Sequence, residues 1–208
     1  MKITIDRANV SIKDGKVIID LDSERLENIM STNKVQLSTL KTGSKFKLGD
    51  EVFIVLEQTD NGTRVIAKEF AYCDVMFGDN SDWKVSPIRK TLNNDYFKKI
   101  AAIIGEKNIL TMDRDLTSLD GLDDYGTCTD KVSLLTSAEY AKYHKILGLK
   151  SNYPNSWWLI TPASTPSNNY FHYVCFVCSH GILDRFGGRY SRDVRPFLTL
   201  RSSILVSI

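Results

Sequence analysis

The sequence predicts an α+β protein in which two helices stand among runs of mostly antiparallel strands. Three observations favour this class: alternating strands over residues 43–68, amphipathic helices over 87–104 and 136–147, and short strands separated by Pro, Ser, Asn and Gly after residue 156. With 208 residues, 42% of them apolar and 25% charged, the chain has room for one large domain and a small appendage.

Residues 1–36 are predicted to form a small N-terminal β-hairpin and short helix, with a turn at residues 14–15. The helix is predicted from three apolar residues at helical spacing: Leu26, Ile29 and Met30. The polar stretch 31–36 is the expected linker to a main domain over residues 37–208. Because this unit is too small to be stable alone, we expect it to mediate homo-oligomerisation or attachment, or to pack on the main domain as an extra layer.

The main domain should begin with a β-meander, since Phe53 and Val55 alternate with Ile54 and Leu56, and a turn at residues 60–62 joins this run to a second strand. The first helix has Ser86 as a natural N-cap and Gly105 at its end. A capping box of Thr136 and Glu139 begins the second. Four later segments read as strands, over residues 156–160, 170–177, 193–200 and 203–208.

Charge and motifs exclude several classes of function. The 27 basic and 25 acidic side chains nearly cancel, so we expect no nucleic-acid partner. The first residues lack the apolar core of a signal peptide, and no apolar run approaches the ~20 residues of a membrane span. We therefore expect no membrane contact and a cytoplasmic or virion-associated protein. Nucleotide-binding and zinc-protease motifs do not occur, so no cofactor is predicted.

The composition changes near the C-terminus. Residues 159–208 contain no Lys, Glu, Gln, Met or Trp, and five arginines oppose two aspartates there. Every residue over 169–194 can be encoded by a codon ending in a pyrimidine, which results when the adenines of asparagine codons are randomised. A ligand-binding surface would show the same Tyr, Arg and His content. The alternative is that a strand-rich end favours Tyr, Val and Phe without any selection for binding.

We take residues 170–192 as the candidate binding segment, although strand alternation exposes only about half of them. The candidate contact residues are Tyr170, His172, Tyr173, Phe176, His180, Arg185, Phe186, Arg189, Tyr190 and Arg192. Trp157 and Trp158 are expected to be structural and to point to opposite faces of a strand. Arg195, before Pro196, is expected to act as a structural clamp through its five donors.

Two motifs in this region, WWLITP at 157–162 and VRPFL at 194–198, resemble the hallmark of an uncharacterised bacterial and phage domain family. That family has Trp-Trp-Leu-Arg-Ser-Pro, a variable strand region, and Val-Arg-Pro-Ala-Leu. Residues 43–68, 83–97 and 130–136 resemble its upstream motifs, so the likeness covers about residues 37–200. Ile160 and Phe197 depart from the family's usual Arg and Ala.

The family is similar to the C-type-lectin-like fold, including formylglycine-generating enzymes and the variable proteins of diversity-generating retroelements. The resemblance implies a compact α+β domain whose C-terminal segment forms an exposed ligand-binding face. It makes a non-enzymatic binding protein of phage, prophage or mobile-element origin the leading hypothesis, with a protein or cell-surface macromolecule as ligand. A fixed-surface inhibitor of a host defence complex and a formylglycine-generating-type enzyme are the alternatives.

The residues themselves give catalysis and metal binding little support. The four cysteines are too scattered for a disulfide scaffold, and Cys175-x-x-Cys178 lacks a second pair at zinc spacing. His144, His172 and His180 have no nucleophile or carboxylate partner at a recognisable spacing. Six aspartates crowd the region between the helices, where a solvated acidic loop is favoured over a calcium site: Asp113, Asp115, Asp120, Asp123, Asp124 and Asp130. No catalytic residue and no metal ligand is predicted.

Overall fold

The computed structural model describes residues 9–13, 16–20, 34–147 and 155–208. β1 (Asn9–Lys13) pairs antiparallel with β2 (Lys16–Asp20), which confirms the predicted hairpin. The helix expected around Ile29, and the predicted end of the second helix at Gly148, lie outside the described residues.

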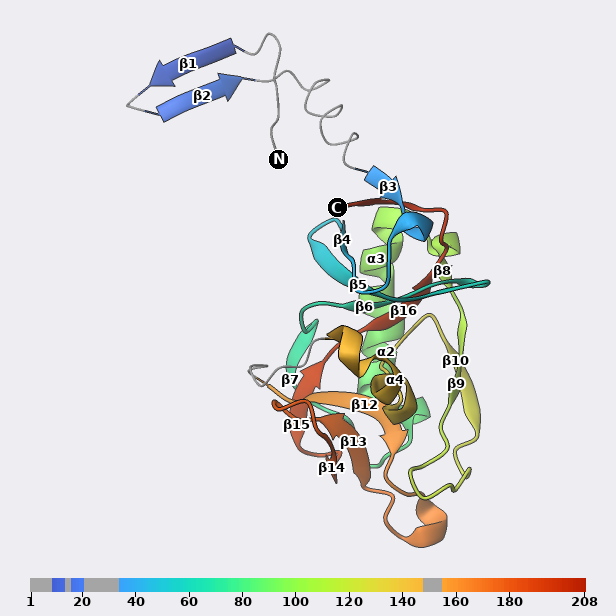
Figure 1. Cartoon of the computed structure of the whole chain (residues 1–208). Helices are drawn as coiled ribbons and strands as arrows, with labels where there is room; N and C mark the ends of the chain where they lie inside the picture. Colours follow the sequence, from blue (N-terminus) through green and yellow to red (C-terminus); the bar gives the residue numbers. More distant parts are fainter. Residues whose placement is uncertain (1–8, 14–15, 21–33, 148–154) are drawn as a thin grey trace.

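An eight-stranded antiparallel sheet forms one part of the main domain (Figure 1). Its order is β11-β16-β6-β5-β4-β17-β3, with β8 also beside β16. The strands are β3 (Lys34–Gln36), β4 (Lys45–Leu48), β5 (Glu51–Thr59), β6 (Gly62–Ala67), β8 (Ile109–Leu110), β11 (Val132–Ser133), β16 (Phe197–Leu200) and β17 (Leu205–Ser207). β4 to β6 are the predicted meander. The end of the expected linker forms β3, which pairs with β17, so the sheet begins at Lys34 rather than after residue 36.

A five-stranded sheet carries most of the candidate binding segment, in the order β14-β13-β12-β15-β7. Its strands are β7 (Tyr72–Met76), β12 (Trp157–Pro162), β13 (Tyr173–Val177), β14 (Leu183–Gly187) and β15 (Ser191–Val194). All neighbours are antiparallel except β12 and β15. Figure 1 shows this sheet at the end of the domain opposite β3. A small hairpin of β9 (Met112–Asp115) and β10 (Thr127–Asp130) replaces much of the expected acidic loop.

The predicted first helix forms as α2 (Pro87–Thr91), a π-helical segment η3 (Leu92–Tyr96) and α3 (Phe97–Ile104). The Ser86 hydroxyl accepts a hydrogen bond from the Ile88 N–H at 3.3 Å, which confirms the predicted cap. Short 3-10 helices complete the domain: η1 (Leu37–Thr39), η2 (Trp83–Val85), η4 (Glu106–Asn108) and η5 (Pro166–Asn168).

The second helix is α4 (Ser137–Leu147), and its predicted capping box is present. The Glu139 N–H donates to the Thr136 hydroxyl at 3.1 Å, and the Glu139 carboxylate accepts from the Thr136 N–H at 2.8 Å. The same carboxylate binds both terminal nitrogens of the buried Arg114 guanidinium, at 2.9 and 2.6 Å. The box therefore ties α4 to β9.

We expect Glu139→Gln to lower the free energy of unfolding at pH 7 by about 2–3 kcal/mol, because charged hydrogen bonds to Arg114 are lost. Burial of Glu139 opposes its ionisation, but the Arg114 and Thr136 donors outweigh burial and hold its pKa below the usual 4.5. A depressed pKa stabilises the fold above pH 4.5, and this contribution is lost as pH falls through the folded-state value. In urea unfolding, the difference in free energy of unfolding between the wild type and Glu139→Gln should be smaller at low pH than at pH 7. A difference that does not change with pH would contradict the ion pair.

The core has two parts, which meet at β12. One part packs the first helix against the sheets, and the other lies between α4 and the strands. Trp158 belongs to the first and Trp157 to the second, and both are fully buried. This confirms that the two indoles point to opposite faces of β12. The ring centroids of Tyr140, in α4, and Trp157 lie 5.7 Å apart. The Tyr143 hydroxyl donates a hydrogen bond to the Glu57 carboxylate of β5 at 2.6 Å, so α4 bridges the two sheets.

Candidate functional site

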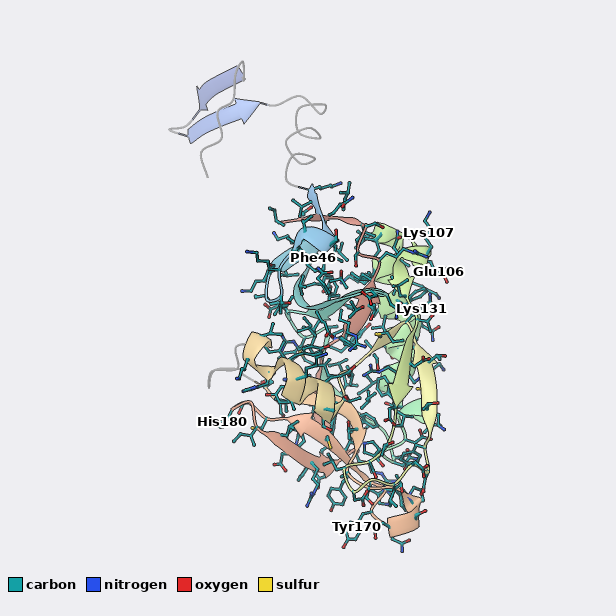
Figure 2. The ribbon with its side chains drawn as sticks, turned by 45° about the vertical axis from the view of Figure 1, so that its right-hand side comes forward. Phe46, Glu106, Lys107, Lys131, Tyr170 and His180 are labelled. Carbon is teal, nitrogen blue, oxygen red and sulfur yellow. The ribbon has the colours of Figure 1, made fainter. Side chains whose placement is uncertain are left out.

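Eight of the ten candidate contact residues are exposed. They are Tyr170, His172, Tyr173, His180, Arg185, Phe186, Arg189 and Tyr190. Tyr170 and Tyr190 are 64% and 59% exposed, which is unusual for large aromatic side chains. Figure 2 shows Tyr170 and His180 pointing outward near opposite ends of the β13 strand.

The exposed rings form local pairs on the loops and strands around the β13–β14 hairpin. Phe186 lies 4.4 Å from the Tyr190 ring, and Tyr170 lies 6.4 Å from that of Tyr173. The inner strand behind them is buried from Val174 to Val177 on both faces. Exposed aromatic and cationic side chains therefore surround a strand that is closely packed in the core.

Phe176 is a correction to the predicted contact set. Only 6% of it is exposed, because it faces Trp158 at 6.2 Å and the Arg192 guanidinium covers its ring at 4.3 Å. Arg192 is itself half-buried and also lies over Phe186 at 5.2 Å. We therefore assign Phe176 to the core, and Arg192 to the layer that covers it.

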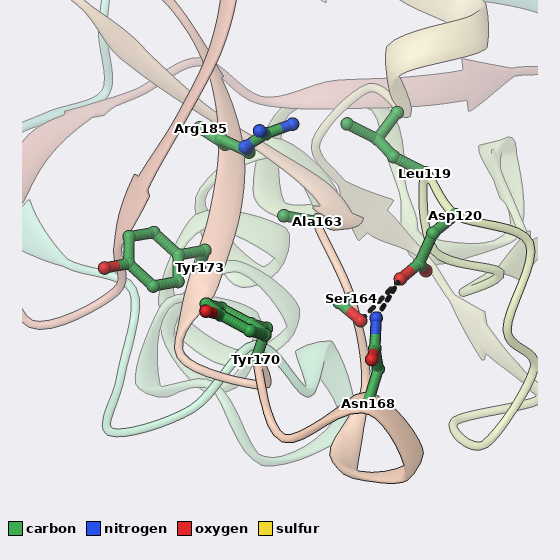
Figure 3. A pocket seen from close by; sticks show the side chains of 8 residues that line it. All are labelled: Leu119, Asp120, Ala163, Ser164, Asn168, Tyr170, Tyr173 and Arg185. Atoms are coloured by element: carbon green, nitrogen blue, oxygen red, sulfur yellow. Dashed lines mark hydrogen bonds between the residues drawn. The ribbon is translucent and has the colours of Figure 1, made fainter.

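An open cavity of about 540 Å³ lies beside the hairpin (Figure 3). Its lining residues are Leu119, Asp120, Ala163, Ser164, Asn168, Tyr170, Tyr173 and Arg185. Three chain segments meet here: the loop between β9 and β10, the end of β12 with η5, and the β13–β14 hairpin. Two tyrosines, an exposed leucine and a few polar groups give the mixed lining that is typical of ligand sites.

The two charged groups of the cavity differ in their surroundings. Hydrogen bonds from Ser118 and then from Ser164, at 2.6 Å, lower the pKa of Asp120 to about 2. Asn168 donates to the same carboxylate at 3.2 Å. In contrast, the described residues offer no hydrogen-bond acceptor to the Arg185 guanidinium, which is exposed on the other side of the cavity (Figure 3). Asp120 is thus held by the protein, while Arg185 is available.

The predicted structural residues lie beneath this surface. The Trp158 indole N–H donates to the Val75 carbonyl at 2.8 Å and ties β12 to β7. Arg195 is fully buried; its Nε donates to the Ala67 carbonyl at 2.8 Å, and its guanidinium lies over Trp157 at 5.4 Å. The Pro196 carbonyl accepts from the Ala67 N–H at 2.9 Å. The contacts of Arg195 and Pro196 join the chain directly after the binding segment to β6.

The cysteines are all free thiols. Burial raises the pKa of the Cys175 thiol to about 12, because nearby Arg185 only partly offsets burial. A thiol with this pKa is protonated at neutral pH and is a poor nucleophile. Among the histidines, His172 contacts the Asp79 carbonyl at 3.0 Å and His180 contacts the Ser179 hydroxyl at 3.3 Å.

The acidic region is not one solvated cluster, which corrects the sequence interpretation. Asp130 is buried, and its carboxylate accepts hydrogen bonds from Trp83 and Arg89, each at 2.7 Å. Asp124 is exposed but holds η5 by accepting from the N–H and hydroxyl of Ser167. Within the described ranges, no group of three or more His, Cys, Asp or Glu side chains is arranged to hold a metal ion.

Half of the residues that line the cavity are not among the predicted contact or acidic-loop residues. Leu119, Ser164 and Asn168 carry no local signal, because they meet only through the tertiary fold. The sequence places Asp120 only within a run of acidic residues. The exposure of Leu119, 53% of its surface, is seen only in the structure.

Comparisons of the chain with protein-family models, with curated proteins and with solved structures give no match in any of the three. In the described part of the chain, no helix combines the length and apolarity needed to cross a membrane. The described residues form an α+β fold with mostly antiparallel strands and two principal helices.

Proposed function

We propose that this chain is a non-enzymatic ligand-binding protein of phage, prophage or mobile-element origin. Its main domain would be C-type-lectin-like, and residues 170–192 would present a variable surface to a protein or cell-surface macromolecule. The observation that carries this proposal is the set of eight exposed aromatic, histidine and arginine side chains on and beside the β13–β14 hairpin, whose inner strand is buried.

Side chains of this kind favour binding over chemistry. Aromatic residues and arginines are the usual energetic anchors of protein interfaces, and exposed clusters of them often mark interaction sites. The high pKa of Cys175 and the lack of an acidic partner for His172 and His180 in the described hydrogen bonds support a non-enzymatic role. The Lys-free and Glu-free composition of residues 159–208 agrees with diversification of this segment.

Replacing Arg189 and Tyr190 together with Ala tests whether the segment is a display surface. Arg189 pairs with Asp79 at 3.0 Å, but both are largely exposed, and such a pair contributes ~0–1 kcal/mol. We therefore expect the double variant to change the free energy of unfolding by less than about 1 kcal/mol. Phe176→Ala, a control at a buried position of β13, should cost about 3–5 kcal/mol. Equal losses in chemical denaturation would show that Arg189 and Tyr190 belong to the core.

The DNA that flanks the gene tests the diversification itself. A nearby reverse transcriptase gene, and a near-copy of the coding segment for residues 169–194 that differs at adenines, are the expected findings. A cluster of small early phage genes without such a copy would contradict diversification and would favour the fixed-surface inhibitor. This test is independent of protein folding.

A further inference from the structure

Arg185 stands where two hollows meet. Its side chain lines the 540 Å³ cavity with Tyr173 and a smaller hollow of about 130 Å³ with Ser137 and Cys175, while Leu119 lines both. Arg185 is exposed, and no acceptor among the described residues binds its guanidinium. A planar guanidinium in this state can bind a carboxylate through two parallel hydrogen bonds.

The charge around Arg185 favours an acidic ligand. Asp120 is the other charged residue of the cavity, but Ser164 and Asn168 bind its carboxylate on the side away from Arg185 (Figure 3). The carboxylate of Asp184 turns back to the main chain, where it accepts a hydrogen bond from the Arg185 N–H at 2.8 Å. Among the described residues, Arg185 is the one cationic side chain that lines the cavity, and it is the group that a ligand carboxylate can reach.

The edge strand β14 argues against a second copy of this chain as the occupant. Gly188 N–H donates to the His172 carbonyl and Cys178 N–H to the Ile182 carbonyl, so even-numbered residues of β14 point their peptide groups at β13. The outward peptide groups therefore belong to odd-numbered residues. The symmetric antiparallel register that pairs the whole of β14 with its own copy places Arg185 opposite Arg185, and like charges there are destabilising.

We propose that the cavity binds an extended acidic segment of a different protein, in which one Asp or Glu carboxylate pairs with both outer nitrogens of Arg185. A neighbouring apolar side chain of the segment lies against Leu119, Tyr170 and Tyr173. This inference rests on the proposed function, because it names the class of partner for the same surface.

The test uses a random linear peptide library displayed on phage and selected on the full-length protein. We expect the enriched peptides to share an Asp or Glu next to an apolar residue. In fluorescence anisotropy, Arg185→Glu should lower the affinity for these peptides by about tenfold or more. Arg201→Glu, the same charge change at an exposed arginine bound to the Lys107 carbonyl, should stay within about twofold. Replacing the acidic residue of the peptide with Lys should restore binding to Arg185→Glu alone.

Three results would overturn the inference: enriched peptides without an acidic residue, equal losses for the two charge reversals, or a single-stranded DNA oligonucleotide that binds more tightly than any peptide and needs Arg185. Melting temperatures of both variants, measured alongside, show that the losses are not unfolding. Peptides whose binding depends on Arg189 and Tyr190 but not on Arg185 would support the display surface and contradict the role of Arg185 as an anchor for a carboxylate. Peptides whose binding does not depend on Arg185, Arg189 or Tyr190 would contradict both the acidic anchor and the display surface.

Discussion

Asp130→Ala is expected to lower the free energy of unfolding by about 3–5 kcal/mol, which is the usual cost of removing one partner from a buried ion pair. The Asp130 side chain is 1% exposed, and it accepts hydrogen bonds from the Trp83 indole and the Arg89 Nε. The variant leaves the buried indole N–H of Trp83 and the partly buried guanidinium of Arg89 without the carboxylate that accepts their hydrogen bonds. Urea unfolding at neutral pH measures the loss.

A matched control lies on the same hairpin. Asp113 is exposed, and Asp113→Ala should change stability by less than about 0.5 kcal/mol. Asp130→Asn should fall between the two, since it keeps an acceptor for Trp83 but loses the charge that pairs with Arg89. If Asp130→Ala costs no more than Asp113→Ala, the buried network does not hold the fold.

This network also positions the cavity. The side chain of Asn93, in η3, binds both the N–H and the carbonyl of Val132, and Asp130 holds the preceding strand β10. The loop that carries Leu119 and Asp120 starts and ends on β9 and β10. Loss of Asp130 should therefore loosen one wall of the cavity as well as the core.

Features whose determining residues are neighbours in the chain could be predicted from the sequence. Ser86 and Gly105 bound the first helix, and the Thr136–Glu139 capping box begins the second, because caps act over three or four residues. The opposite orientation of Trp157 and its neighbour follows from strand geometry alone. None of these predictions requires knowledge of the tertiary fold.

The predictions failed where a distant residue decides the outcome. Phe176 is covered by Arg192 of another strand, and Asp130 is buried by Trp83, 47 positions away. Alternation along β13 cannot show that both faces of the strand are covered. The cavity could not be predicted either, since Leu119 and Arg185 meet only after the two segments have packed.

Trp158→Ala is expected to cost about 3–5 kcal/mol and to damage the binding surface from below. The indole is fully buried, contacts Phe77 at 5.8 Å and Phe176 at 6.2 Å, and donates to the Val75 carbonyl. Its removal leaves a cavity under the strand that carries Phe176, so that strand loses its support. Chemical denaturation gives the loss of stability.

Trp158→Phe separates packing from hydrogen bonding. This variant keeps an aromatic ring but leaves the Val75 carbonyl without its donor, which should cost about 1–3 kcal/mol. Tyr190→Ala, at an exposed position in the turn between β14 and β15, should cost less than about 1 kcal/mol. The order of the three losses matters because a binding surface can vary in sequence only if its base is independently stable. Similar losses for Tyr190→Ala and Trp158→Ala would mean that the exposed residues and the core are not separable, and the surface could not then tolerate diversification.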